Sequence, residues 1–195
     1  MGLAIMIFGL AVFFGSHTFT TMRTQRAALI ARTGEVAYKV AYSVVSLVAI
    51  VLIAYGFSAY RAAGMIDIWN PPRWLRHVNN LLLWPAFICV AAAYIPGDIK
   101  RVLKHPMLVG IKLWAFGHLL ANGDLGSIIL FGSFLAWAAY DRITLKYRSD
   151  PGAPDFGLGG RDCDILAVVV GTLLYLAVGF WFHPYIVGVP AFVVR

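Results

Sequence analysis

The chain has 195 residues, of which 61% are hydrophobic and only 13% are charged. Soluble domains are about 45–50% apolar and about 25% charged, so this composition is that of an integral membrane protein. The formal net charge is +7, but the basic residues lie in short segments between apolar runs instead of forming one stripe or tail. This distribution is typical of charges that set membrane topology, and it argues against a nucleic-acid partner.

Six apolar runs approach the roughly 17–25 residues that a bilayer-spanning helix needs. They predict an all-α polytopic bundle of about six transmembrane helices in the lipid bilayer, with residues 1–195 forming a single domain. The predicted spans are residues 3–22, 38–60, 78–96, 106–122, 126–143 and 165–183. The first run follows no basic segment and precedes no small-residue cleavage site, so we expect a retained helix and not a signal peptide.

The basic residues orient the predicted bundle. The segments after the first, third and fifth spans carry most of them: Arg23, Arg26, Arg32, Lys39, Lys100, Arg101, Lys104, Arg142, Lys146, Arg148 and Arg161. The opposite side holds Arg61, Arg73, Arg76 and Arg195. The positive-inside rule therefore predicts that the richer side is cytoplasmic and that both chain ends lie outside.

Two connections are longer than a hairpin. Residues 61–77 contain a Pro-Pro turn between Trp69 and Trp74, which we expect to anchor in the membrane interface or to cover a cavity. Residues 149–164 are rich in Gly, Pro and Asp and predict a flexible cytoplasmic loop. The two cysteines, Cys89 and Cys163, lie too far apart in the predicted topology to form a disulfide.

The fourth predicted span carries polar residues on one face. Pro106 suits the first turn of this helix, where its missing N–H is not needed. Trp114, His118 and Asn122 follow at i, i+4 and i+8, so they share a face. Ionisable side chains at membrane depth cost several kcal/mol, roughly 2.5–3.5 for Lys on insertion scales, and are functional candidates by default.

Histidines are the strongest candidates for ligands. His17 and His118 lie inside predicted spans, whereas His77, His105 and His183 lie at span ends, where interfacial hydrogen bonding is the simpler interpretation. Imidazole is the common axial ligand of haem iron, and two intramembrane imidazoles on different helices could hold one haem. Small residues near both histidines (Gly9, Gly15, Gly110, Gly117 and Ala121) could make room for the macrocycle.

Helix geometry limits the pairings. His105 and His118 are 13 residues apart, about 20 Å along one helix and on nearly opposite faces, so they cannot bind the same iron. His17 and His118 differ in predicted depth by roughly 9 Å across a core of about 30 Å. The depth difference between His17 and His105 is no larger, so spacing alone does not identify which histidine pairs with His17.

The same part of the chain also allows a different function, the transport of ions or protons. Lys112 and Asp124 lie in or beside the fourth span, and together with histidine they could form an ion or proton pathway. The spans contain almost no acidic residues, however, and sites that couple ion or proton transport usually need an acidic residue. The sequence has no H-x-x-x-H or HExxH motif, so zinc has little support.

The segment from His105 to Arg142, HPMLVGIKLWAFGHLLANGDLGSIILFGSFLAWAAYDR, closely resembles the NnrU family of bacterial membrane proteins. The Gly15-Ser16-His17 segment and the W-x-P-P-x-W-x-R-H run from Trp69 to His77 fit the same family. That family is associated with denitrification and nitric-oxide-related gene clusters. It is related to the plant 15-cis-zeta-carotene isomerase, a membrane enzyme that carries b-type haem between two histidines.

The resemblance implies haem b with His17 and His118 as axial ligands to the iron, and it favours His118 over His105. The isomerase has a cysteine three residues before its second histidine, implicated as an alternative ligand, where this chain has Ala115. Our first hypothesis is a bacterial inner-membrane haem protein of nitric-oxide metabolism, working with a nitrogen-oxide reductase or an electron-transfer partner. The alternatives are a haem-dependent isomerase of a polyene substrate and a haem-free transporter or assembly factor. No catalytic residue is assigned.

Overall fold

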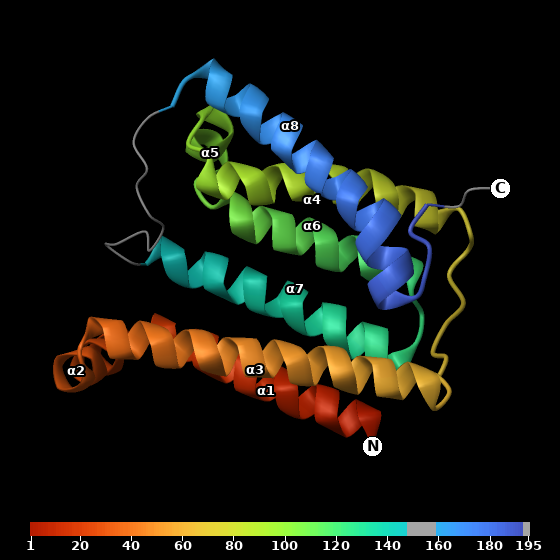
Figure 1. The fold of residues 1–195 in the computed structure, drawn as a ribbon, viewed down its shortest axis with the longest axis horizontal. Helices are drawn as coiled ribbons and strands as arrows, with labels where there is room; N and C mark the ends of the chain where they lie inside the picture. The colour runs from red at the N-terminus through yellow and green to blue at the C-terminus, as the bar shows by residue number, and fades with distance from the viewer. Residues whose placement is uncertain (148–158, 193–195) are drawn as a thin grey trace. The chain divides into compact units, whose positions relative to one another are not determined.

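The computed structural model describes residues 1–147 and 159–192. Over these residues the chain is all-α, with eight α-helices followed by one π-helical segment (Figure 1). The elements are α1 (Gly2–Thr21), α2 (Arg23–Thr33), α3 (Glu35–Ala62), α4 (Leu75–Tyr94), α5 (Asp98–Leu103), α6 (Pro106–Ala121), α7 (Leu125–Lys146), α8 (Arg161–Ala177) and η1 (Val178–Val187). Most of the predicted cytoplasmic loop lies outside the described residues, as do Arg148 and Arg195 of the charge count.

Within the described part of the chain, five helices are long and apolar enough to cross a membrane: α1, α3, α4, α7 and the continuous segment Arg161–Val187 formed by α8 and η1. The helix α6 is equally apolar but has only 16 residues, which gives it a length of about 24 Å. The prediction of a polytopic all-α membrane bundle is confirmed. The six predicted spans correspond to five full-length helices and one shorter apolar helix.

The backbone contacts divide the chain into two compact units. The first unit contains Met1–Ile68 and Asp124–Ser133, and the second contains Trp69–Gly123 and the described part of Phe134–Arg195. The helix α7 contributes its first residues to one unit and the remainder to the other. His17 belongs to the first unit and His118 to the second, and each unit is described by itself.

In the first unit, α1 and α3 pack through glycines. A Cβ at Gly9 would come within 2.9 Å of the backbone nitrogen of Ile53, and a Cβ at Gly2 or Gly56 would overlap backbone of the opposite helix. Small residues let two backbones approach closely, which is the main source of helix association where lipid removes the hydrophobic driving force. Met6 fills the seam and is fully buried.

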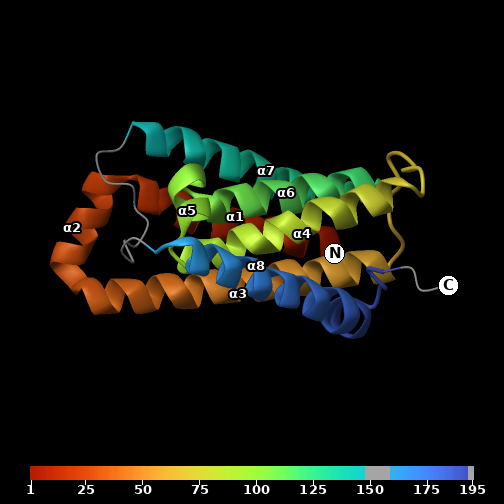
Figure 2. The same ribbon diagram turned by 90° about the horizontal axis from the view of Figure 1, so that it is seen from above.

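The helix α2 runs across the end of the α1–α3 pair (Figure 2). None of its residues is buried, and the guanidinium of Arg26 lies 5.6 Å from the ring centroid of Tyr38 on α3. The next helix begins after Gly34, whose φ of 85° favours glycine. Its first turn carries an ion pair between Glu35 and Lys39 with an N–O distance of 2.7 Å.

The residues that follow α3 are hydrogen-bonded to the start of α7. The hydroxyl of Tyr60 accepts a hydrogen bond from the backbone N–H of Ile66 at 2.9 Å. The carbonyl of Ile66 in turn accepts the N–H of Leu125 at 2.8 Å. Asp124 caps α7, because its carboxylate accepts the N–H of Ser127 at 2.9 Å.

In the second unit, α4 lies between α6 and α8 (Figures 1 and 2). On the α8 side, a Cβ at Gly171 would meet the backbone of Ile88 at 2.5 Å. The indole of Trp84 donates to the hydroxyl of Thr172 at 3.0 Å. On the α6 side, a Cβ at Gly110 would come within 2.8 Å of the carbonyl oxygen of Ala86. Both faces of α4 therefore depend on small residues of its neighbours.

Candidate functional site

His17 lies in the last turns of α1, and its imidazole is half-buried. Its Nδ1 lies 2.8 Å from the carbonyl oxygen of Phe13, one turn earlier. The imidazole stacks on the Phe13 ring at a centroid distance of 3.9 Å, and the Tyr42 ring from α3 lies 5.2 Å away. The hydroxyl of Ser16 also donates to the Phe13 carbonyl, at 2.8 Å. Aromatic and backbone contacts thus fix the orientation of this imidazole.

His118 lies in the last turn of α6, and its imidazole is also half-buried. Its Nδ1 lies 2.8 Å from the carbonyl oxygen of Trp114, and the two rings are 5.4 Å apart. The amide of Asn122 donates to the carbonyl of His118 at 2.8 Å. The predicted shared face is therefore present for Trp114 and His118, whereas Asn122 follows the end of α6 with an extended backbone. The sequence also identified Pro106 correctly as the first residue of this helix.

The two histidines have the same local arrangement. A carbonyl oxygen can only accept a hydrogen bond, so Nδ1 carries the proton in both imidazoles. The lone pair then lies on Nε2, the nitrogen through which histidine commonly binds a metal. Histidines that bind metals almost always donate their other N–H to a carbonyl or carboxylate, because this fixes the tautomer and the ring orientation.

His183 lies closer to His118 than the sequence indicated. Its ring centroid is 6.4 Å from that of His118, and the two ring planes differ by 30°. His183 belongs to η1, and its Nδ1 lies 2.7 Å from the carbonyl oxygen of Val189. It therefore has the same tautomer as His17 and His118. The sequence does not indicate this proximity, because His118 and His183 are 65 positions apart and no local pattern connects the end of α6 to η1.

The other two histidines have separate positions. His105 is the residue before α6, and its carbonyl accepts the N–H groups of Leu108 and Val109. His77 lies in the first turn of α4 with an exposed side chain. Among the described residues, no group of three or more His, Cys, Asp or Glu side chains could hold a metal ion. Cys89 and Cys163 are free thiols, as the sequence predicted.

The glycines near His118 have a different role from the predicted one. A Cβ at Gly117 would overlap the side-chain oxygen of Asn79 on α4, and Gly110 faces the same helix. Gly9, near His17, likewise packs on α3. These three positions are small because helices approach there, so the expectation that they make room for a macrocycle is wrong. Gly15 is exposed, and no described residue lies within 4 Å of a Cβ placed there.

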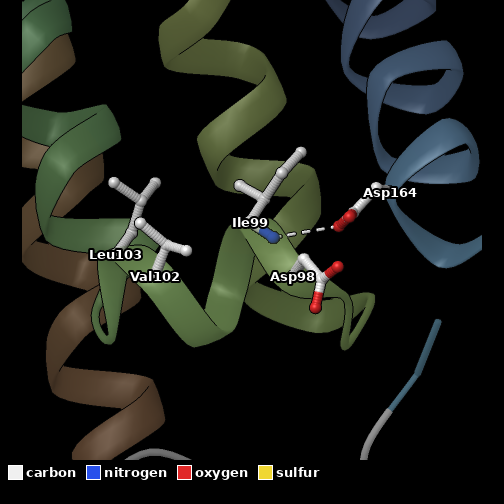
Figure 3. Close-up of a pocket in the computed structure, with 5 residues that line it drawn as sticks. All are labelled: Asp98, Ile99, Val102, Leu103 and Asp164. Atoms are coloured by element: carbon white, nitrogen blue, oxygen red, sulfur yellow. Dashed lines mark hydrogen bonds between the residues drawn. The ribbon is translucent and has the colours of Figure 1, made fainter. Parts of the chain in front are cut away.

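A shallow pocket of about 390 Å³ lies elsewhere in the second unit, between α5 and the start of α8 (Figure 3). Its polar groups stabilise the fold. The carboxylate of Asp164 accepts the N–H of Ile99 at 3.0 Å and so caps α5. Asp98 forms an ion pair with Arg101 at 2.9 Å. Asp124, which the ion-pathway hypothesis required, is similarly accounted for by its cap on α7.

A family model described as NnrU protein matches residues 5–191. The chain belongs to the NnrU family. The match runs through both units and includes every histidine of the chain. The resemblance drawn from the segment between His105 and Arg142 is thereby confirmed, and an NnrU chain of this kind is a multi-span membrane protein. No curated protein and no solved structure matches the sequence.

Proposed function

We propose that this NnrU chain is a bacterial inner-membrane protein that binds b-type haem with His17 and His118 as axial ligands. It acts in nitric-oxide and denitrification-related metabolism, together with a nitrogen-oxide reductase or an electron-transfer partner. Membership of the NnrU family supports the metabolic setting. The local geometry of the two histidines supports the cofactor.

The observation that carries the proposal is a shared hydrogen bond. In both His17 and His118, Nδ1 donates to the carbonyl four residues earlier at 2.8 Å. In the neutral imidazole this bond leaves the lone pair on Nε2, the nitrogen that can bind iron.

The side chains around each imidazole suit an apolar macrocycle. Phe13 and Tyr42 flank His17, and Trp114 lies beside His118 with Phe134 packed edge-on against it at 5.4 Å. Haem bound by these histidines supplies one-electron chemistry and, when one imidazole leaves, an iron position for a small ligand. The protein's own contribution is to hold both imidazoles in the ligating tautomer.

The isomerase alternative receives less support from these residues. Ala115 occupies the position at which the isomerase has its alternative thiol ligand. The Ala115 side chain is fully buried in the second unit. A thiol-based exchange of ligands is therefore absent at this position. Because function depends on the site and not on the fold, isomerase activity does not follow from family membership.

Visible spectroscopy of the purified protein tests the proposal. The protein in detergent should contain about one b-type haem per chain by the pyridine haemochrome assay, with a sharp α-band on reduction. His118→Ala should abolish the six-coordinate spectrum of the haem. His17→Ala should shift the ferric low-spin signal of the haem or remove it. His77→Ala is the matched control, because that imidazole is exposed at the start of α4, and it should leave the spectrum unchanged. A colourless protein, expressed with excess haem, would contradict the proposal.

A further inference from the structure

The helix α2 is a polar segment at the end of two apolar helices. Both α1 and α3 are long and apolar enough to cross a membrane, and α2 connects them and runs across their shared end (Figure 2). A polar connection between two consecutive spans lies at the membrane surface, at the level of the lipid headgroups. The 11 residues of α2 include three arginines and no acidic residue. This helix therefore adds only positive charge to its side of the membrane.

Arg26 is held in place without an anionic partner. Its guanidinium carbon lies 5.6 Å from the centroid of the Tyr38 ring on α3, which is a cation–π contact. Its Nε is buried and has no hydrogen-bond partner among the described residues. Glu35, the acidic residue at the start of α3, is paired with Lys39 at 2.7 Å. The cation is thus positioned within the first unit while one of its donors is unused.

Tyr38 carries a second unused donor beside Arg26. Its side chain is only 8% exposed, and its hydroxyl is buried with no hydrogen-bond partner in the described part of the chain. The ring stacks with that of Tyr42 at 6.4 Å, and the backbone N–H donates to the carbonyl of Gly34 at 3.1 Å, so the residue is fixed next to the turn from α2 to α3. Buried polar groups without a partner are costly and rare. Two of them on neighbouring side chains indicate a shared acceptor that is not part of the chain.

We propose that Arg26 and Tyr38 bind the phosphate of an anionic phospholipid in the leaflet on the α2 side of the membrane. The Nε–H of Arg26 and the hydroxyl of Tyr38 donate to the non-ester oxygens of the phosphate, and the guanidinium supplies the opposite charge. Met22 and Leu29 lie at i−4 and i+3 from Arg26, and their side chains are 45% and 38% exposed. Exposed apolar side chains on both sides of a cation suit a lipid, whose glycerol and acyl chains continue from the phosphate.

The charge of α2 favours an anionic lipid over a zwitterionic one. A zwitterionic headgroup carries its own ammonium, which compensates the phosphate charge, whereas an anionic headgroup leaves that charge for the arginines. The positive-inside rule places this side in the cytoplasm, where Arg23 and Arg32 add to the attraction. Because the two donors come from α2 and α3, a bound phosphate connects these helices and should stabilise the first unit.

The test measures lipid binding to the full chain in detergent by native mass spectrometry, with dioleoylphosphatidylglycerol as the anionic probe and dioleoylphosphatidylcholine as the zwitterionic comparison. Phosphatidylglycerol should bind more tightly and should raise the thermal midpoint of the protein. Arg26→Gln should weaken its binding about tenfold, through loss of a charge-assisted hydrogen bond. Tyr38→Phe keeps the ring beside Arg26 and should weaken binding about fivefold. Without added lipid, Tyr38→Phe should be no less stable than the unmodified protein, because its hydroxyl then has no ligand.

Arg32→Gln is the matched control. It removes the same charge from an exposed position of α2, about 120° around the helix from Arg26, and should change the affinity by less than about twofold. Should Arg26→Gln not elute as a single species, Arg26→Lys replaces it with the same expected loss, because lysine keeps the charge without the Nε donor.

Three results would overturn the inference, and none depends on whether haem is bound. Equal weakening by Arg26→Gln and Arg32→Gln would show that the lipid responds to the overall charge of α2 and not to a site. Equal binding of the two lipids would show that the headgroup charge is not recognised. If inorganic phosphate at millimolar concentration raises the thermal midpoint as much as phosphatidylglycerol does, the two donors bind a free anion and not a lipid.

Discussion

The side-chain amide of Asn80 donates a hydrogen bond to the backbone carbonyl of Ala191 at 3.1 Å, although the two residues are 111 positions apart. This bond attaches the segment after η1 to the first half of α4. The adjacent Phe192 packs against Tyr175 and Phe180, with ring centroids 5.3 and 4.8 Å away. One polar bond and one aromatic cluster therefore hold the loop that follows η1.

Asn80→Ala should loosen this loop. The variant removes the donor and leaves the carbonyl of Ala191 without it, which costs about 1 kcal/mol. Hydrogen exchange of the peptide 184–192 should accelerate by roughly fivefold. Asn79→Ala is the matched control, since Asn79 contacts α6 instead of the C-terminal segment. Equal protection of this peptide in the two variants would show that the aromatic cluster alone holds the loop.

Gly117→Leu should destabilise the protein even without any cofactor. The added side chain would overlap Asn79 at the contact between α6 and α4. Overpacking of this kind costs about 1–3 kcal/mol, so the thermal midpoint of the haem-free protein in detergent should fall. Gly15→Leu places the same side chain on an exposed position of α1 and should leave the midpoint unchanged. A normal midpoint for Gly117→Leu would mean that α4 can shift to accept the larger residue.

Two tyrosines of the first unit should respond in opposite ways to loss of the hydroxyl. The Tyr38 hydroxyl is buried and has no hydrogen-bond partner among the described residues, whereas the Tyr60 hydroxyl accepts the N–H of Ile66. Removing an unsatisfied buried polar group is neutral or stabilising, but removing a used acceptor costs about 1 kcal/mol. Thermal unfolding should therefore place Tyr38→Phe at or above the unmodified protein and Tyr60→Phe below it. Destabilisation by Tyr38→Phe would indicate a lipid or water partner for that hydroxyl.

The sequence predicts the apolar helices well because length and hydropathy are local properties. The first predicted span, residues 3–22, corresponds to Gly2–Thr21, and the fourth, 106–122, corresponds to Pro106–Ala121. The polar helices α2 and α5 were missed, since both are too short and too polar to register as spans. The last predicted span, 165–183, is longer in the structure because acidic residues in the first turn of α8 suit a helix start and η1 continues it to Val187.

The candidate site is only partly readable from sequence. The shared face of Trp114 and His118 follows from helical periodicity and is confirmed, whereas Asn122 lies just beyond the end of α6 and bonds the His118 carbonyl through its side chain. The choice of tautomer and the proximity of His183 depend on backbone carbonyls and on packing across α4, which no local pattern encodes. The glycines were misread for a similar reason: a small residue in a membrane helix indicates close approach, and the sequence does not say whether a helix or a cofactor approaches.

The predicted orientation can be checked with the chain's own thiols. Cys163 lies in the first turn of α8, beside Arg161 on the side that the positive-inside rule places in the cytoplasm, whereas Cys89 is buried in α4. A membrane-impermeant maleimide should therefore label neither thiol in intact spheroplasts and should label Cys163 alone after permeabilisation. Asn70→Cys, in a background with both native cysteines replaced, lies on the opposite side and should react in intact spheroplasts. Labelling of Cys163 without permeabilisation, together with protection of residue 70, would show that the topology is the reverse of the predicted one.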